Sequence, residues 1–206
     1  LPPGIFIPIA EQMGLMVELG RWVVREGMRQ AAHWKLDCGI PIAINLSAVQ
    51  FYQHDLLESI AAHLEEFQID SSCIEFEITE SMVMKDLDRS VEMMQRLADR
   101  GFGISLDDFG TGYSSLSYLK RFPVSTLKID QSFVKGIGVD PADEAIVQSV
   151  ISLGHALKVK VLAEGVETSE QFEWLKTYGC DEMQGYLMAK PMSVGDFQHF
   201  YTSHSC

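Results

Sequence analysis

Six short apolar runs occur along the chain, and the segments between them repeat apolar residues at helical spacing. The runs cover residues 40–46, 74–78, 102–106, 126–129, 159–163 and 183–187, and each predicts a strand. The expected helices cover residues 16–34, 56–67, 87–97, 142–157, 169–178 and 192–206. Thr168 followed by Gln171 resembles a capping box at the start of one of them. Strands that alternate with helices predict right-handed crossovers and a mainly parallel sheet.

Nearly every expected strand carries, near one end, a polar residue that is able to bind a metal ion or an anion. These residues are Asn45, Glu77, Asp107, Asp108, Lys128 and Glu164, together with Gln184, which opens the sixth strand. A barrel collects the C-terminal ends of its strands around one mouth, whereas an open sheet spreads them along an edge. No phosphate-binding GxGxxG or Walker-type loop follows any strand. Both observations favour an α/β fold of the (β/α)8 barrel type over an open doubly wound sheet.

The strand count is smaller than a complete barrel requires. That fold has eight strands and about 250 residues, so six strands in 206 residues leave a β-hairpin unaccounted for. Because residues 192–206 have a helical pattern, we expect the hairpin to precede Leu1. The lack of an initial Met agrees with a chain taken from a longer protein. We therefore expect residues 1–206 to form one domain that lacks its first two strands.

Composition and charge exclude several classes of protein. With 47% hydrophobic residues the chain is too apolar for disorder, yet it has no run of roughly 18 apolar residues that would span a membrane. A formal net charge of −13 opposes binding to DNA or RNA, because their phosphates would be repelled. The four cysteines are far apart and form no CxxC pair, which favours reduced thiols in the cytoplasm.

Asp107 and Asp108 are the clearest candidates for chemistry. Two adjacent ionised carboxylates at the end of an apolar strand repel each other and are costly to bury. Oxygen ligands without a nearby His cluster or Cys pair favour Mg²⁺ or Mn²⁺. One carboxylate that bridges two such ions would make a two-metal hydrolytic site. The alternative is a solvated turn before Gly110, Thr111 and Gly112.

The other acids each have two interpretations. Strand alternation puts Glu75 and Glu77 on one face, which suits either an ordinary surface strand or a barrel mouth with Glu77 as a metal ligand. In the second case Glu80, just past the strand, would tether a loop. Glu164 ends an otherwise apolar strand, which favours a functional role. Glu167 suits a site or a plain helix start equally.

Lys128 and Asn45 also remain open from the residues alone. Lys128 lies within an expected buried strand, where lysine is rare unless it is paired. It forms an ion pair with Asp130 or Asp108, or it polarises a water molecule or a phosphoryl oxygen. Asn45 is either a neutral oxygen ligand or a turn residue.

Several ordered motifs contain these candidates and extend to both ends of the chain. They are Pro3-Gly4, Phe6-Ile7-Pro8, Ala10-Glu11, Asn45-Leu46-Ser47, Glu77-Ile78-Thr79-Glu80, Asp107-Asp108-Phe109-Gly110-Thr111-Gly112-Tyr113-Ser114-Ser115-Leu116, Leu127-Lys128-Ile129-Asp130, Ala163-Glu164-Gly165-Val166-Glu167 and Gln184-Gly185-Tyr186. In this order and spacing the chain resembles the EAL-domain family of cyclic di-GMP phosphodiesterases, from Leu1 to about Met192.

The resemblance implies a fold, a reaction and a set of ligands. The fold would be a modified (β/α)8 barrel whose first strand is antiparallel. The reaction would be hydrolysis of one phosphodiester of cyclic di-GMP to linear 5'-pGpG, assisted by Mg²⁺ or Mn²⁺. One metal ion would be bound by Asn45, Glu77 and Asp107. Asp107 would bridge to a second ion, bound also by Asp108 and Glu164. Lys128 would position the attacking water.

Further residues would support this site. Gln184 and Glu167 would hold the metal-water shell, with Asp130 and Pro191 also on the substrate side. A regulatory loop would link substrate binding to dimerisation, with Glu80 anchoring it. The members of that loop are Phe109, Gly110, Thr111, Gly112, Tyr113, Ser114 and Ser115.

One departure from the family pattern concerns the Glu-Ala-Leu signature and a nearby Arg, which should precede Leu1. Both would fall in the hairpin that the strand count also leaves out, so we expect the chain alone to be poorly active and its parent protein to be active. The expected partners are cyclic di-GMP, a second copy of the chain, and sensory or GGDEF domains upstream. Such a parent is cytoplasmic, with a membrane anchor elsewhere left open. The alternatives are a non-catalytic cyclic di-GMP receptor and a dimerisation module.

Overall fold

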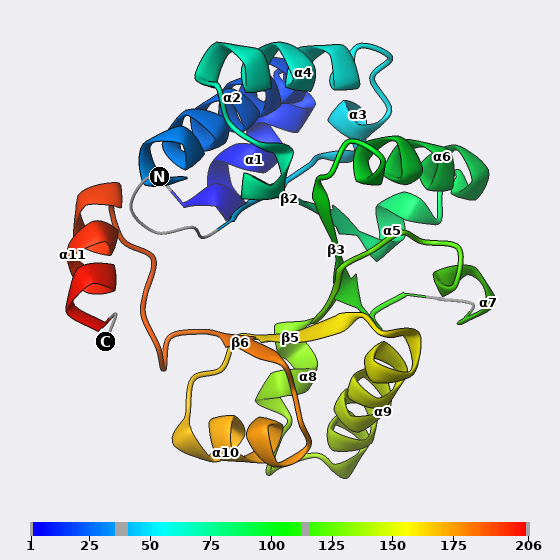
Figure 1. Cartoon of the computed structure of the whole chain (residues 1–206). Helices are drawn as coiled ribbons and strands as arrows, with labels where there is room; N and C mark the ends of the chain where they lie inside the picture. Colours follow the sequence, from blue (N-terminus) through cyan, green and yellow to red (C-terminus); the bar gives the residue numbers. More distant parts are fainter. Residues whose placement is uncertain (1, 36–40, 113–115, 205–206) are drawn as a thin grey trace.

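The computed structural model describes residues 2–35, 41–112 and 116–204, and its centre is one curled parallel sheet (Figure 1). The strands are β1 (Ile42–Asn45), β2 (Ile74–Thr79), β3 (Gly103–Phe109), β4 (Thr126–Ile129), β5 (Lys160–Glu164) and β6 (Glu182–Gln184). They pair in sequence order, and every pairing is parallel. The sheet curls like half of a barrel, so the expected α/β architecture of barrel type with six parallel strands is confirmed.

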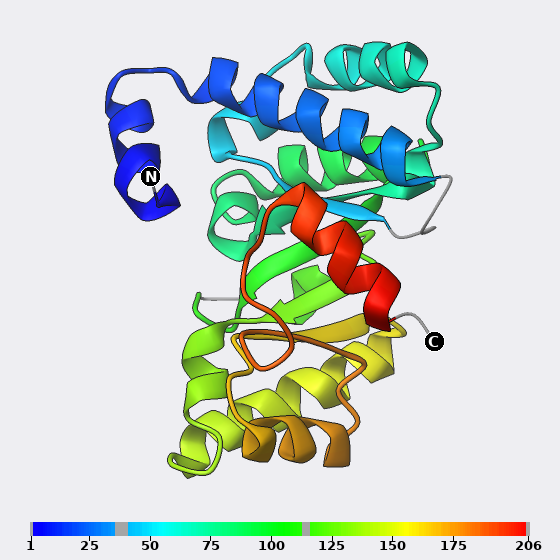
Figure 2. The same ribbon diagram turned by 90° about the vertical axis from the view of Figure 1, so that its left-hand side faces the viewer.

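Eleven α-helices lie within the described ranges, and most of them pack around the outside of this curl (Figure 1). They are α1 (Pro3–Gln12), α2 (Met16–Lys35), α3 (Ala48–Phe51), α4 (Leu56–Phe67), α5 (Glu80–Val83), α6 (Leu87–Ala98), α7 (Leu116–Leu119), α8 (Gln131–Lys135), α9 (Pro141–Leu157), α10 (Ser169–Thr177) and α11 (Val194–His204). The last helix differs from the others, because it lies across the side where β1 and β6 end the sheet (Figure 2). Its Phe197 ring contacts Trp34 of α2 at a centroid distance of 4.9 Å.

The two faces of the sheet have different compositions, as β2 illustrates. Ile74, Phe76 and Ile78 are fully buried and belong to the hydrophobic core between the sheet and the outer helices. Glu75 and Glu77 alternate with them and are only partly buried, so they face the inside of the curl. Burial of the apolar face stabilises the fold, and the same alternation leaves a concave face on which polar side chains gather.

Most expected elements form within a few residues of their expected bounds, and the differences have local causes. The sixth strand ends at Gln184 instead of beginning there, because Gly185 packs against the backbone of Val166 and starts a turn. The helix α1 was not expected; Pro2 and Pro3 at its start fit the first positions of a helix. The short helices α3, α5, α7 and α8 were also not expected, because four or five residues are too few for a hydrophobic period to show.

No helix within the described ranges combines the length and the apolar character that crossing a bilayer would require.

The capping box expected at the start of α10 is present, and it yields a stability prediction. The Gln171 backbone N–H donates to Thr168 Oγ1 (3.2 Å), and the Thr168 N–H donates to Gln171 Oε1 (3.1 Å). We expect Thr168→Ala to lower the free energy of unfolding by about 1 kcal/mol in urea denaturation, because a helical N–H loses its acceptor. Ser169→Ala, at the next and exposed hydroxyl, is the control, with an expected change within about 0.5 kcal/mol. Equal losses in the two variants would contradict a stabilising role for the box.

Candidate active site

The Lys128 ammonium lies at the centre of the concave face, in contact with three carboxylates. Its Nζ is 2.7 Å from Glu77 Oε1, 2.7 Å from Glu164 Oε1 and 3.2 Å from Asp107 Oδ1. These side chains come from β4, β2, β5 and β3 in turn. Four strands can direct side chains at one point only from the inside of a curled sheet. The curl of the sheet therefore creates this group, which we call the Lys128 cluster: Lys128, Glu77, Asp107 and Glu164.

Two amide side chains hold the outer carboxylates of the Lys128 cluster. Asn45 Nδ2 donates to Glu77 Oε2 (2.7 Å), and the register of the sheet pairs these two residues directly across β1 and β2. At the other side Gln184 Nε2 donates to Glu164 Oε1 (3.0 Å), again between residues paired in register. Six strands thus supply one continuous network at the mouth of the curl, and each member sits near the C-terminal end of its strand.

Burial and charge act against each other in the Lys128 cluster. The Lys128 side chain is only 4% exposed, and its burial alone would favour the neutral amine. Hydrogen bonds to Glu164 and Glu77 outweigh that burial, so the pKa of Lys128 is raised above its ordinary value. Burial raises the pKa of Glu164, and its contact with Lys128 only partly offsets this effect, because Asp107 and Glu77 add negative charge. One ammonium therefore contacts three acidic side chains, and the cluster has more acidic than basic groups.

An irregularity in β3 places the adjacent acids Asp107 and Asp108. The register with β4 shifts between Leu106 and Phe109, and Asp108 has a left-handed φ of 55°. Such a bulge re-aims the side chains of a strand. Asp107 joins the Lys128 cluster and is 9% exposed. Asp108 stays near it, and burial together with the negative charge of Asp107 raises the pKa of Asp108. The doublet is therefore part of a strand rather than a solvated turn.

Lys128 does not form the ion pair with Asp130 or Asp108 that the sequence left open; among the described residues its partners are the three acids of the cluster. Asp130 instead caps α8, where its Oδ1 accepts the Ser132 N–H (3.0 Å). The reason is direction: Lys128 points into the curl, while Asp130 lies just beyond the strand at the start of the next helix.

Glu80 contacts the segment that follows the aspartate doublet. It is 2% exposed, its Oε2 accepts the Gly110 N–H (3.1 Å), and a Cβ built on Gly112 would come within 2.5 Å of its Oε1. Gly110 has a φ of 98°, a conformation that suits glycine. These contacts hold residues 109–112 against the start of α5. Tyr113, Ser114 and Ser115 lie outside the described residues.

A cleft of about 770 Å³ opens beside Glu164 and Gln184. It extends along the loop after β6 toward α11, and Glu167, Pro191 and Lys190 also line it. Glu167 is exposed and precedes the N-cap of α10, to which its backbone is tied by a 2.8 Å hydrogen bond from its N–H to Gln171 Oε1. A ligand of nucleotide size fits a cleft of this volume.

The donors of this site suit a divalent cation in chemistry. Carboxylate and amide oxygens are the ligands that Mg²⁺ and Mn²⁺ prefer, and the Lys128 cluster has an excess of negative charge. No group of three or more Asp, Glu, His or Cys side chains in the described part of the chain is spaced to hold a metal ion. Their present spacing fits the ammonium of Lys128, at which the three carboxylates point.

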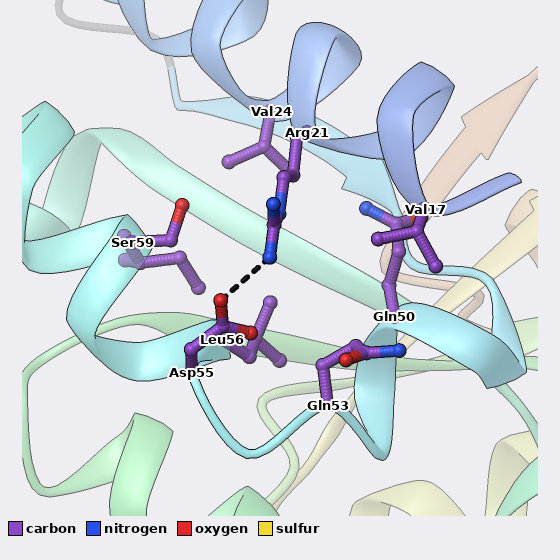
Figure 3. Close-up of a pocket in the computed structure, with 9 residues that line it drawn as sticks. Val17, Arg21, Val24, Gln50, Gln53, Asp55, Leu56 and Ser59 are labelled. Carbon is purple, nitrogen blue, oxygen red and sulfur yellow. Dashed lines mark hydrogen bonds and ion pairs between the residues drawn. The ribbon is translucent and has the colours of Figure 1, made fainter. Parts of the chain in front are cut away.

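A second, much smaller hollow lies in the helical layer between α2, α3 and α4 (Figure 3). Arg21 Nη2 lies 2.5 Å from Asp55 Oδ2 there, beside Gln50 and Val24. Its volume of about 20 Å³ admits a water molecule and no larger ligand. The lining contains one acid, Asp55, and Arg21 already neutralises it. The cleft beside Glu164 is much larger and is lined by a member of the Lys128 cluster, so it is the candidate site.

Several residues of this cleft have no role that the sequence alone predicts. Lys135, Lys190, Tyr186, Trp34 and Phe197 all line it, although they come from four separate segments. No local pattern identifies them, because only the curl of the sheet and the position of α11 bring them together. Glu75 had no assigned role beyond sharing a face with Glu77; its Oε1 accepts hydrogen bonds from the hydroxyls of Ser105 and Ser125 below the Lys128 cluster.

Known proteins resemble this chain in both sequence and fold. The EAL domain family model matches residues 1–191. The bifunctional diguanylate cyclase/cyclic di-GMP phosphodiesterase MucR of Pseudomonas aeruginosa is 46% identical over 93% of the chain and 28% of its own length. The cyclic di-GMP phosphodiesterase PdeR of Escherichia coli is 39% identical over 98% of the chain and 31% of its length. A solved structure of the PaMucR phosphodiesterase in complex with c-di-GMP matches with a TM-score of 0.92 and 45% identity, over 96% of this chain and 81% of that one.

The half-barrel is thus a fold that this chain shares with the PaMucR phosphodiesterase. The chain belongs to the EAL domain family. It spans about a quarter to a third of the length of the curated relatives it matches.

Removal of the central ammonium should be costly. We expect Lys128→Met to lower the free energy of unfolding by about 3–5 kcal/mol at neutral pH, because three partly buried carboxylates lose their counter-charge. Lys160→Met is the matched control: Lys160 pairs with Glu182 at 2.7 Å but is 65% exposed, so about 0–1 kcal/mol is expected. Denaturant unfolding of both variants is the measurement. Similar losses at the two positions would show that the Lys128 cluster does not depend on its ammonium.

The raised pKa of Asp108 predicts a pH-dependent variant. A carboxyl whose folded-state pKa is above its ordinary 3.8 favours folding below that value and loses this contribution as the pH rises. Asp108→Asn removes the titration, so the variant should gain stability over the parent as the pH rises above the ordinary value of 3.8. Unfolding free energies measured in EDTA at several pH values test this. A difference that stays constant with pH would come from the left-handed backbone alone and would contradict the electrostatic account.

Proposed function

We propose that the domain hydrolyses one phosphodiester of cyclic di-GMP to linear 5'-pGpG with the help of Mg²⁺ or Mn²⁺. The observation that carries the proposal is the convergence of Glu77, Asp107 and Glu164 on one point at the mouth of the sheet. Relatives with 39–46% identity are named cyclic di-GMP phosphodiesterases, which supports the same substrate here. Folding does not require three acidic side chains to be buried together, and such groups of acids are typical of functional sites.

The oxygen ligands for divalent cations would be Asn45, Glu77, Asp107, Asp108 and Glu164. Cations held there would polarise a phosphoryl oxygen and lower the pKa of a bound water. The need for positive charge is electrostatic: the Lys128 cluster is negative, and so is a phosphodiester. The bulge that brings Asp108 beside Asp107 would then serve to present two carboxylates from adjacent residues on one side of β3.

Lys128 would position the attacking water in this proposal. An ammonium has three N–H donors, and all three have a carboxylate acceptor within 3.2 Å. Lys128 Nζ can therefore donate to a water only when one of the three carboxylates leaves it to contact another positive charge. Its raised pKa keeps the ammonium protonated at neutral pH, so it acts as a donor and not as a base.

The two amides would fix the orientation of the outer acids. Asn45 Nδ2 holds Glu77, and Gln184 Nε2 holds Glu164, each through one carboxylate oxygen. Glu80 would relay changes at the site to residues 109–112, which it contacts directly. Glu167 and Pro191 would border the substrate in the cleft.

The surroundings of the domain are also proposals. Curated relatives are three to four times longer than this chain, and one is an oxygen sensor protein, DosP of Escherichia coli. We therefore infer that sensory or GGDEF domains adjoin this domain in a cytoplasmic signalling protein, and that it acts as a homodimer.

Hydrolysis can be tested with one variant. In the protein that contains this chain, Asp107→Asn should reduce cyclic di-GMP turnover in Mn²⁺ by at least about 100-fold, because a central carboxylate is lost. Asp99→Asn, at the exposed end of α6, is a matched control and should keep parental turnover. Product formation is followed by chromatography of 5'-pGpG. Equal turnover by Asp107→Asn and the parent would contradict the site assignment. Tight calorimetric binding without product in either metal would replace the proposal with a receptor function.

A further inference from the structure

The cleft beside Glu164 contains two lysines that are separate from the Lys128 cluster. Lys135 is in the last turn of α8, and Lys190 follows β6 by six residues, yet both line the same cleft. Both side chains are exposed. No motif in the sequence assigns a role to either lysine, and the proposed hydrolysis does not use them.

These two lysines keep their positive charge available. Among the ion pairs of the described residues neither one has a carboxylate partner. Lys135 Nζ donates to the neutral Gln131 Oε1 at 3.2 Å. Lys190 Nζ lies 5.6 Å from the centre of the Tyr186 ring, which is also neutral. Each ammonium therefore has donors left for an anion. In a chain with a net charge of −13, such cations in a cleft concentrate the local positive potential.

The segments that carry both lysines pack against the turn that follows Glu164. Gly165 follows Glu164 directly, and a Cβ there would meet Gln131 Cβ at 2.6 Å. Gln131 therefore packs against this turn, and Lys135 belongs to the same helix, α8. The loop after β6 is fixed to the same turn, because the Leu187 N–H donates to Val166 O (3.0 Å). The backbone positions of both lysines relative to Glu164 are thus set by packing.

A cyclic dinucleotide carries two phosphodiesters, and only one can be at the acids at a time. The Lys128 cluster has no positive charge to spare, because its single ammonium already contacts three carboxylates. The phosphate that is not cleaved lies away from these acids, in the cleft whose lining includes Lys135 and Lys190. We propose that Lys135 and Lys190 bind this second phosphate and select ligands with two phosphates over ligands with one. This inference rests on the proposed function and deepens it.

The test compares two ligands and two double variants of the protein that contains this chain. Calorimetry in EDTA prevents turnover and measures binding of cyclic di-GMP and of cyclic GMP, which has one phosphate. Lys135→Gln/Lys190→Gln should weaken cyclic di-GMP binding at least about tenfold, leave cyclic GMP binding within about twofold, and reduce the salt dependence of binding. Lys85→Gln/Lys176→Gln removes the same charge outside the cleft and should bind like the parent. Circular dichroism checks that each variant is folded.

The possible failures are distinguishable. If the parent binds cyclic di-GMP and the Lys135→Gln/Lys190→Gln variant binds it equally, the assignment of the second phosphate is overturned while the proposed function stands. If both ligands weaken by the same factor, the lysines act through general charge and selection by phosphate number is overturned. If the parent binds neither ligand in EDTA and also forms no 5'-pGpG in Mn²⁺, the proposed function falls and this inference with it. If the parent binds neither ligand in EDTA but forms 5'-pGpG in Mn²⁺, the kinetic comparison decides, and an unchanged KM in the Lys135→Gln/Lys190→Gln variant overturns the inference. In Mn²⁺, the expected kinetic signature is a raised KM with kcat within about threefold, and Lys135→Arg/Lys190→Arg should restore the KM.

Discussion

The Lys128 ammonium is the one positive charge among three carboxylates from three different strands, and the arrangement of the concave face depends on it. Without a counter-charge, Glu77, Asp107 and Glu164 would repel one another in a partly buried space where water screens them poorly. With it, the three acids lie close together near the ends of their strands. The same contacts restrict function, because an ammonium shared among three acids has no donor left for a substrate. In the proposed function, positive charge for the substrate would therefore come from divalent cations and from other groups in the cleft.

The fold separates stability from chemistry by strand alternation. Residues such as Phe76, Ile78 and Leu106 pack outward against the helices and are fully buried, so the hydrophobic core lies between sheet and helices. The inward positions of the same strands are thereby free to carry acids, amides and a lysine. The bulge in β3 and the turns at Gly165 and Gly185 then set where these side chains and the neighbouring lysines lie.

Much of this arrangement follows from the sequence, and the rest depends on long-range geometry. The alternation of apolar runs and helical periods predicted all six strands, because both periods are local properties of the chain. The polar strand ends predicted that Asn45, Glu77, Asp107 and Glu164 would lie at one rim, and the structure places them there. The partners of Lys128 could not be derived, since Glu77 is 51 residues away in sequence and only the curl brings it near. Lys135 and Lys190 could not be predicted for the same reason. Lys135 lies in the helix α8 after β4, Lys190 lies in the loop after β6, and no local pattern in the sequence marks either lysine.

The most direct test of this account is the titration of the Lys128 side chain itself. In protein labelled with ¹⁵N-lysine and held in EDTA, the Nζ resonance of Lys128 can be assigned by its absence from the Lys128→Met variant. The account predicts that this group remains an ammonium well above the ordinary lysine pKa of about 10.4, because three carboxylates stabilise its charge. A Lys128 that titrates at or below that value would show that burial outweighs the acids. The convergence of Glu77, Asp107 and Glu164 on one charge would then be contradicted.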